Sequence, residues 1–127
     1  MELVAIVLGL ALVQYLYFTL RCGQARGRLG IPAPAMTGAP EFERRLRVQQ
    51  NTVEQLVIFV PALILFAKYV SEPAAAGLGL VFILGRALYA RAYMLDPAKR
   101  GPGFGLTLLG SGVLLIGGLI GAIVALV

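Results

Sequence analysis

Polar side chains that could bind or activate a ligand are concentrated in one stretch of the chain. It reads EFERRLRVQQNTVE, from Glu41 to Glu54, and leads into the apolar run LVIFVPALILFA. Arg47, Asn51 and Glu54 are spaced i, i+4 and i+7, so they share one face of a helix. A helix that carries such a face into a membrane must bury it against protein or a polar ligand. We therefore expect this face to form a site.

A second polar face follows in the next long segment, where Arg86, Tyr89 and Tyr93 are spaced i, i+3 and i+7. Arginine binds carboxylates in a bidentate manner, and Glu54 could hold an ammonium group. Together the two faces suit a small, peptide-like ligand that carries carboxylates and an amino group. A simpler alternative is that Arg47 or Arg86 pairs with Glu54 and that the tyrosines form an interfacial belt. It explains the whole set less well, because the arginines outnumber their partners.

The composition excludes several kinds of catalysis. The chain has no histidine, which removes Ser-His hydrolase chemistry and the usual base at neutral pH. Its single cysteine, Cys22, excludes an intrachain disulfide and any multi-cysteine metal site. We expect no bound metal, and any catalysis must come from the remaining polar side chains or a bound co-substrate.

Four apolar segments must position the two faces, within a single domain that covers residues 1–127. The chain is 59% hydrophobic, against about 45–50% in soluble domains, and its mean hydropathy is +0.87. A helix needs about 20 residues to cross a bilayer core. The sequence therefore predicts an all-α, integral membrane four-helix bundle, with spans at approximately Leu3–Leu20, Leu46–Tyr69, Ala74–Leu95 and Gly103–Val127.

The distribution of charge predicts the topology. Ten of the eleven Lys and Arg residues lie in or beside the first and third connections, and only Lys68 lies opposite. By the positive-inside rule those connections are cytoplasmic, so both termini face outward. The net charge of +5 is then a topology signal, and we expect no nucleic-acid partner because no soluble domain carries a basic patch.

The connections themselves are rich in glycine and proline. The residues from Arg21 to Pro40, RCGQARGRLGIPAPAMTGAP, predict a connection without a helix across it. GPGFG at 101–105 is predicted to be a flexible connection and not a phosphate-binding loop, since no strand precedes it and Leu106 stands where GxGxxG needs its third glycine. Gly117 and Gly121 form a GxxxG motif that predicts close helix packing.

The two polar faces also resemble a known family. EFERRLRVQQNTVEQLVIFVP resembles the signature of the membrane-associated proteins in eicosanoid and glutathione metabolism, the MAPEG family. The family motif E-R-x-x-R-x-x-x-N-x-x-E is matched at every fixed position. GRALYARAYMLDPAKRGPG resembles the third-helix segment of the same family. The resemblance covers essentially the whole chain.

The resemblance implies a homotrimer of four-helix subunits that bind glutathione between neighbours. Arg100 matches the arginine that lies against the glutathione sulfur in the conjugating members, so we expect it to be catalytic. The positions that match the family's glutathione-binding residues, or that share the third-helix face with them, are Arg26, Arg47, Gln49, Asn51, Glu54, Arg86, Tyr89 and Tyr93.

The implied function is that of a membrane-bound glutathione transferase, or peroxidase, that attacks lipophilic electrophiles or hydroperoxides arriving from the bilayer. The leukotriene synthases of the family carry a tyrosine where this chain has Gln55, which argues against eicosanoid specificity. A general transferase or peroxidase of a bacterial type fits better, and we expect it in a bacterial inner membrane. A non-catalytic scaffold that binds lipid or glutathione is the alternative. A small multidrug transporter is disfavoured, because the first segment carries only Glu2 and no deep carboxylate.

Overall fold

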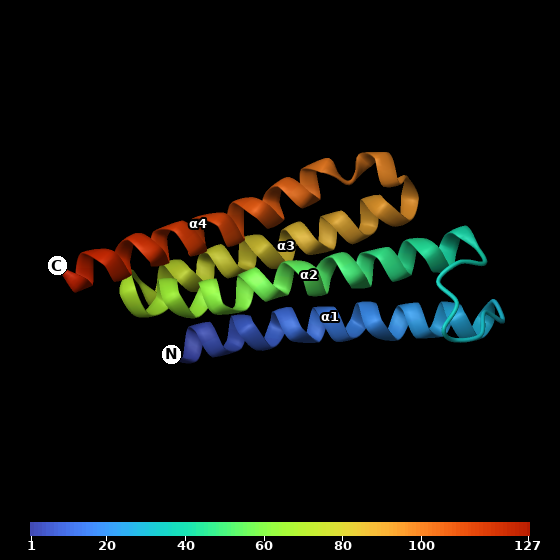
Figure 1. The fold of residues 1–127 in the computed structure, drawn as a ribbon, viewed down its shortest axis with the longest axis horizontal. Helices are drawn as coiled ribbons and strands as arrows, with labels where there is room; N and C mark the ends of the chain where they lie inside the picture. Colours follow the sequence, from blue (N-terminus) through green and yellow to red (C-terminus); the bar gives the residue numbers. More distant parts are fainter.

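Four long helices account for most of the chain in the computed structural model, which describes residues 1–127. They are α1 (Glu2–Arg28), α2 (Pro40–Tyr69), α3 (Glu72–Leu95) and α4 (Gly101–Leu126), and a short 3-10 turn, η1 (Pro97–Lys99), joins the last two (Figure 1). Each long helix is long and apolar enough to cross a membrane. The predicted all-α architecture with four candidate spans is confirmed.

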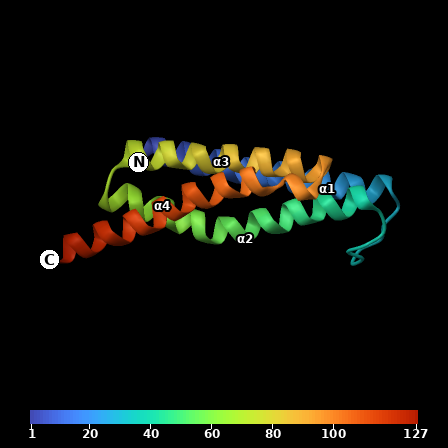
Figure 2. The ribbon, with the colours of Figure 1, turned by 90° about the horizontal axis from the view of Figure 1, so that it is seen from above.

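The helices run side by side and alternate in direction. Both termini and the α2–α3 connection lie at one end, and the first and third connections lie at the other (Figures 1 and 2). The arginine-rich connections therefore share one end of the molecule, as the charge pattern requires. We call it the arginine-rich end. Its assignment to the cytoplasm stays a prediction.

The interior combines aromatic stacking with close approaches at glycine. The rings of Phe59 on α2 and Phe82 on α3 stack with their centroids 3.9 Å apart. α4 packs against α2 at the GxxxG motif: a Cβ added to Gly117 would lie 2.5 Å from the Phe66 ring, and one at Gly121 would lie 2.8 Å from the Tyr69 carbonyl oxygen. The close packing predicted for this motif is confirmed.

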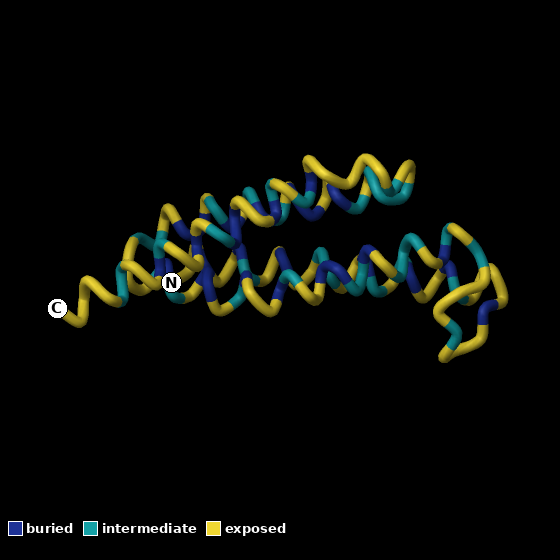
Figure 3. Tube along the Cα trace, turned by 45° about the horizontal axis from the view of Figure 1, so that its top comes forward, coloured by how far each residue is buried: buried dark blue, intermediate teal, exposed yellow.

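The outer surface is apolar along all four helices, and exposed stretches recur from one end of the bundle to the other (Figure 3). Large exposed residues include Leu16 on α1, Val57 on α2, Leu84 on α3 and Ile116 on α4. A soluble monomer rarely exposes such continuous apolar surface. Lipid or a partner chain would cover it without the hydration cost that water imposes.

Two predicted boundaries are wrong. α1 does not end near Leu20 but continues to Arg28, and the chain turns at Gly30, whose φ of +67° suits a residue without a side chain. The helix-breaking prolines begin only at Pro32, so no proline interrupts the helix between Leu20 and Arg28. GPGFG is not a flexible connection either: it forms the first turn and a half of α4, where Pro102 needs no N–H partner.

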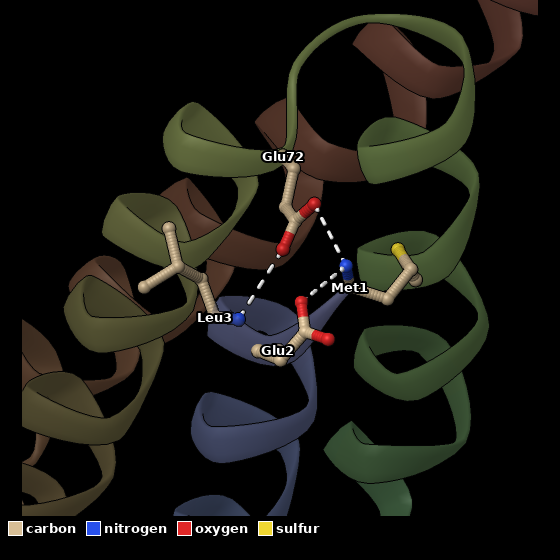
Figure 4. A network of polar contacts seen from close by, with 4 residues as sticks. All are labelled: Met1, Glu2, Leu3 and Glu72. Atoms are coloured by element: carbon tan, nitrogen blue, oxygen red, sulfur yellow. Dashed lines mark hydrogen bonds and ion pairs between the residues drawn. The ribbon is translucent and has the colours of Figure 1, made fainter.

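At the opposite end a polar cluster ties the start of α1 to the start of α3. Glu72 Oε2 lies 3.1 Å from the Met1 amino group, and Oε1 accepts a hydrogen bond of 3.2 Å from the Leu3 N–H (Figure 4). Glu2 also lies 3.2 Å from that amino group. Hydrogen bonds to the two carboxylates, of which Glu72 has the larger effect, raise the pKa of the Met1 amino group above its usual value.

Candidate functional site

A cavity of about 330 Å³ opens at the arginine-rich end between α2, α3 and the beginning of α4. We call it the ligand cavity. It brings together five of the predicted site residues with one residue that was not predicted, Phe104. Its lining residues are Arg47, Asn51, Tyr89, Tyr93, Arg100 and Phe104.

The α2 side of the ligand cavity presents both a charge and an unused acceptor. Asn51 is only 6% exposed, and its side-chain oxygen has no hydrogen-bond partner. A buried polar atom without a partner is costly, so this oxygen is ready for a ligand N–H. Arg47 lies one turn away and makes a loose ion pair with Glu54, with Nη1 3.6 Å from Oε1.

That ion pair bears out part of the simpler alternative raised by the sequence. Both of its side chains are about half exposed, at 44% and 55%, so each remains accessible to a ligand. Exposed pairs of this kind contribute only about 0–1 kcal/mol. A ligand with its own carboxylate and ammonium could therefore replace the pair at little cost.

The α3 side is built from stacked aromatic rings. The rings of Tyr89 and Tyr93 lie 5.5 Å apart at an interplanar angle of 27°, and Phe104 of α4 lies 6.2 Å from Tyr89. The backbone of Tyr89 packs directly against α4 at Gly103, where a Cβ would lie 2.3 Å from the Tyr89 backbone nitrogen. Glycine at this position sets how near Phe104 comes to the tyrosines.

Arg86 does not line the ligand cavity but lies beneath it, with no exposed surface. Its Nη2 donates to Thr52 Oγ1 at 2.9 Å and its Nη1 to Thr107 Oγ1 at 3.4 Å, so one guanidinium joins α2, α3 and α4. Its Cζ lies 4.3 Å from the centre of the Tyr89 ring. No carboxylate neutralises it, so its positive charge acts on whatever the cavity holds.

Arg100 reaches the cavity from the junction between η1 and α4. Asp96 caps η1 by accepting a hydrogen bond of 3.1 Å from the Ala98 N–H, and this turn leads from α3 into α4. Arg100 Nη1 donates to the Pro97 carbonyl oxygen at 2.9 Å. A guanidinium has five N–H donors, so most of them remain available at the mouth of the cavity.

Two predicted residues lie elsewhere in the chain. Arg26 donates from Nη1 to the Ala35 carbonyl at 3.0 Å and lies over the Phe42 ring at 4.6 Å, so it fastens the first connection. Gln49 lies 3.4 Å from the Thr19 hydroxyl of α1. Neither residue lines the ligand cavity of its own chain, and Glu54, which pairs with Arg47, does not line it either.

Two threonines that support Arg86 were not predicted from the sequence. Thr52 and Thr107 are 1% and 0% exposed, and they also donate to carbonyl oxygens of their own helices, Val48 and Gly103, at 2.7 and 2.9 Å. Hydroxyl residues inside apolar helices are the available signal, since they often bond across helices. This signal does not identify the hydrogen-bond partner of each hydroxyl until the packing of the helices is known.

Comparison with known proteins identifies the family of this arrangement. The MAPEG family model matches residues 4–120. The chain belongs to the MAPEG family. This membership supports an integral membrane protein, in agreement with the four candidate spans.

Individual relatives align with this chain over most of their own length. An uncharacterised protein of Synechocystis is 47% identical over 91% of this chain and 85% of its own. Human microsomal glutathione S-transferase 2 is 43% identical over 95% of this chain and 80% of its own. Bovine leukotriene C4 synthase is 35% identical over 77% of this chain and 65% of its own.

Proposed function

We propose that this MAPEG protein is a membrane-bound glutathione transferase that activates the glutathione thiol for attack on lipophilic electrophiles. The observation that carries the proposal is the ligand cavity itself, where two arginines meet the buried, unpartnered oxygen of Asn51. The names of the human and bovine relatives support glutathione as the ligand class.

The charges of the cavity suit glutathione, which has two carboxylates, one ammonium group and a thiol. Arg47 would bind a carboxylate, and Glu54 would bind the ammonium once their mutual pair opens. The free oxygen of Asn51 would accept a hydrogen bond from a peptide N–H. Tyr93 and Tyr89 would supply hydroxyl donors and a flat wall. Arg86 would add positive charge from beneath, without touching the ligand.

Arg100 would supply the chemistry at the sulfur. A thiol with a pKa near 8.5 is only about 3% ionised at pH 7. A guanidinium beside the sulfur favours the thiolate, and each pKa unit gained corresponds to about 1.4 kcal/mol. The proton leaves to water at the cavity mouth. The thiolate then forms a carbon–sulfur bond with the electrophile, whose displaced group or newly formed anion takes up a proton.

We extend the proposal to assembly. Arg26 and Gln49 lie outside the cavity of their own chain, and they would complete the glutathione site of a neighbour in a homotrimer. The exposed apolar helix faces support such an assembly, because they need lipid or protein to cover them. Electrophiles dissolved in the bilayer would reach the sulfur along the same faces. A second reaction open to this site is attack of the same thiolate on a lipid hydroperoxide, which would break the O–O bond, release the alcohol and leave glutathione sulfenic acid; a second glutathione would convert that acid to the disulfide and water.

The test is an ultraviolet difference spectrum of the purified protein with glutathione, beside the Arg100→Ala variant. We expect a thiolate band in the parent protein that is lost or much reduced in the variant, while calorimetry still detects bound glutathione. Binding without a thiolate band in the parent would instead indicate a non-catalytic scaffold. Absence of glutathione binding would refute the proposal.

A further inference from the structure

A second cavity lies on different faces of α2 and α3 from the ligand cavity, and nothing in the proposed reaction uses it. It has a volume of about 300 Å³ and lies between α1, α2 and α3 towards the arginine-rich end. Its wall is mostly apolar and includes Phe18, Val48 and Met94. It shares no lining residue with the ligand cavity.

Three arginines line this second cavity, one from each helix: Arg21, Arg45 and Arg91. We call it the arginine cavity. None of the three donates a hydrogen bond or forms an ion pair within the chain. Every other arginine has a carboxylate, carbonyl or hydroxyl partner. The arginines that have neither a hydrogen-bond acceptor nor an ion-pair partner are thus gathered around a single cavity, where Arg21 contacts only the Tyr17 ring, 5.9 Å from its Cζ.

No carboxylate lines the arginine cavity. Three like charges around one apolar space repel one another, and an anion between them removes that repulsion and adds charge-assisted hydrogen bonds. Guanidinium groups suit phosphate and carboxylate equally well. The mouth of the cavity therefore favours an anionic head, and its wall favours a hydrocarbon chain.

Gln14 gives an independent sign of a ligand deeper in the same cavity. Its Nε2 donates to the Ile83 carbonyl at 3.0 Å, whereas its Oε1 is buried and has no partner. Gln14 lies seven residues before Arg21 on α1, which corresponds to about 10 Å along the helix. An acceptor at that depth in an apolar wall requires a donor, and a hydroxyl group on an acyl chain would supply one.

We propose that the arginine cavity binds a lipid anion, with its phosphate or carboxylate among Arg21, Arg45 and Arg91 and one acyl chain along the apolar wall. The volume lies at the small end of the range of about 300–1,000 Å³ for ligand pockets, which fits a single chain. Gln14 favours a chain with a hydroxyl group partway along it over the unsubstituted chain. This lipid site is separate from the proposed glutathione site.

The proposal is tested by native mass spectrometry of the full-length protein with stearate, monohydroxystearates and dioleoylphosphatidylglycerol. The Arg21→Gln/Arg91→Gln variant is compared with Arg28→Gln/Lys99→Gln, which also loses two positive charges at the same end but outside the cavity. We expect one lipid per chain, bound at least tenfold more weakly by the cavity variant than by the control. Glutathione binding should be unchanged in the cavity variant.

Preferential binding of stearate identifies a free fatty acid as the source of the anion, whereas preferential binding of the phospholipid identifies its headgroup. If no lipid binds, or if both variants weaken binding equally, the site does not exist. If no hydroxystearate binds more tightly than stearate, the contact proposed for Gln14 is wrong.

Discussion

Replacement of Arg86 by methionine should separate stability from ligand binding. The change removes two charge-assisted hydrogen bonds, to Thr52 and Thr107, each worth about 1.5–3 kcal/mol. It also removes a fully buried charge that has no carboxylate partner and whose Nε has no acceptor. Apolar replacements of buried ionic groups are often neutral or stabilising by about 1–4 kcal/mol.

These two effects oppose each other, and the threonines are not left unsatisfied. Both hydroxyls keep their donor bonds to carbonyl oxygens of their own helices. We therefore expect the free energy of unfolding of Arg86→Met to change by less than about 2 kcal/mol, from the balance of these terms. The variant should fold.

Binding of anionic glutathione should fall more clearly. The Arg86 Cζ lies 4.3 Å from the Tyr89 ring centre, and a ligand atom in contact with the cavity side of that ring would be about 4 Å further. At about 8 Å and an effective dielectric constant of about 20, two unit charges attract by about 2 kcal/mol. Screening at the open cavity reduces this, so we expect a loss of about 1–2 kcal/mol, or about 5–30-fold in Kd.

The assay is isothermal titration calorimetry with glutathione, alongside thermal unfolding of the same detergent-purified samples. Arg86→Lys is the matched control, because it keeps the charge and loses the fork of donors, so its Kd should stay nearer that of the parent. A folded Arg86→Met protein with a Kd within twofold of the parent would refute the electrostatic reasoning. An equal loss in both variants would show that shape matters and charge does not.

Two further predictions concern packing and surface charge. Gly103→Ala should destabilise the protein by about 1–3 kcal/mol or more and weaken glutathione binding, because the new methyl group would lie 2.3 Å from the Tyr89 backbone nitrogen. Gly101→Ala is the control, since a Cβ at that position has no atom within 4 Å. Equal thermal unfolding of the two variants would contradict the prediction. Arg28→Ala should leave stability almost unchanged, since its ion pair with Glu41 is exposed; a fall of several degrees in Tm would show otherwise.

Much of the fold follows from local sequence. Apolar length alone predicts four candidate spans, and the gathering of Lys and Arg correctly places two connections at the same end. Helical spacing also predicts which side chains of α2 and α3 face one cavity, since Arg47 and Asn51 lie about one turn apart, as do Tyr89 and Tyr93. These properties depend on residues near one another in the chain, which is why the local sequence pattern is sufficient to predict them.

Other features depend on contacts that no local pattern contains. The first turn of α4 consists of GPGFG, which reads as a flexible connection until Gly103 is packed against the Tyr89 backbone. Arg86 shares a helical face with the tyrosines, yet hydroxyls from two other helices hold it beneath the cavity. The extension of α1 to Arg28 is a milder case, because apolar length measures the membrane and not the end of the helix.

The partners of the arginines distinguish three roles at one end of this bundle. Arg26 and Arg44 donate to backbone carbonyls and hold connections and helix ends in place. Arg86 donates to hydroxyls and keeps an uncompensated charge beneath the ligand cavity.

The three arginines of the second cavity make no hydrogen bond or ion pair within the chain, and they surround an apolar space with an unused acceptor at its base. The positive-inside rule explains why basic residues gather at one end of the bundle. It does not account for their separation into paired and unpaired groups around two distinct cavities. That separation is expected if one cavity takes a small peptide-like anion and the other takes a lipid.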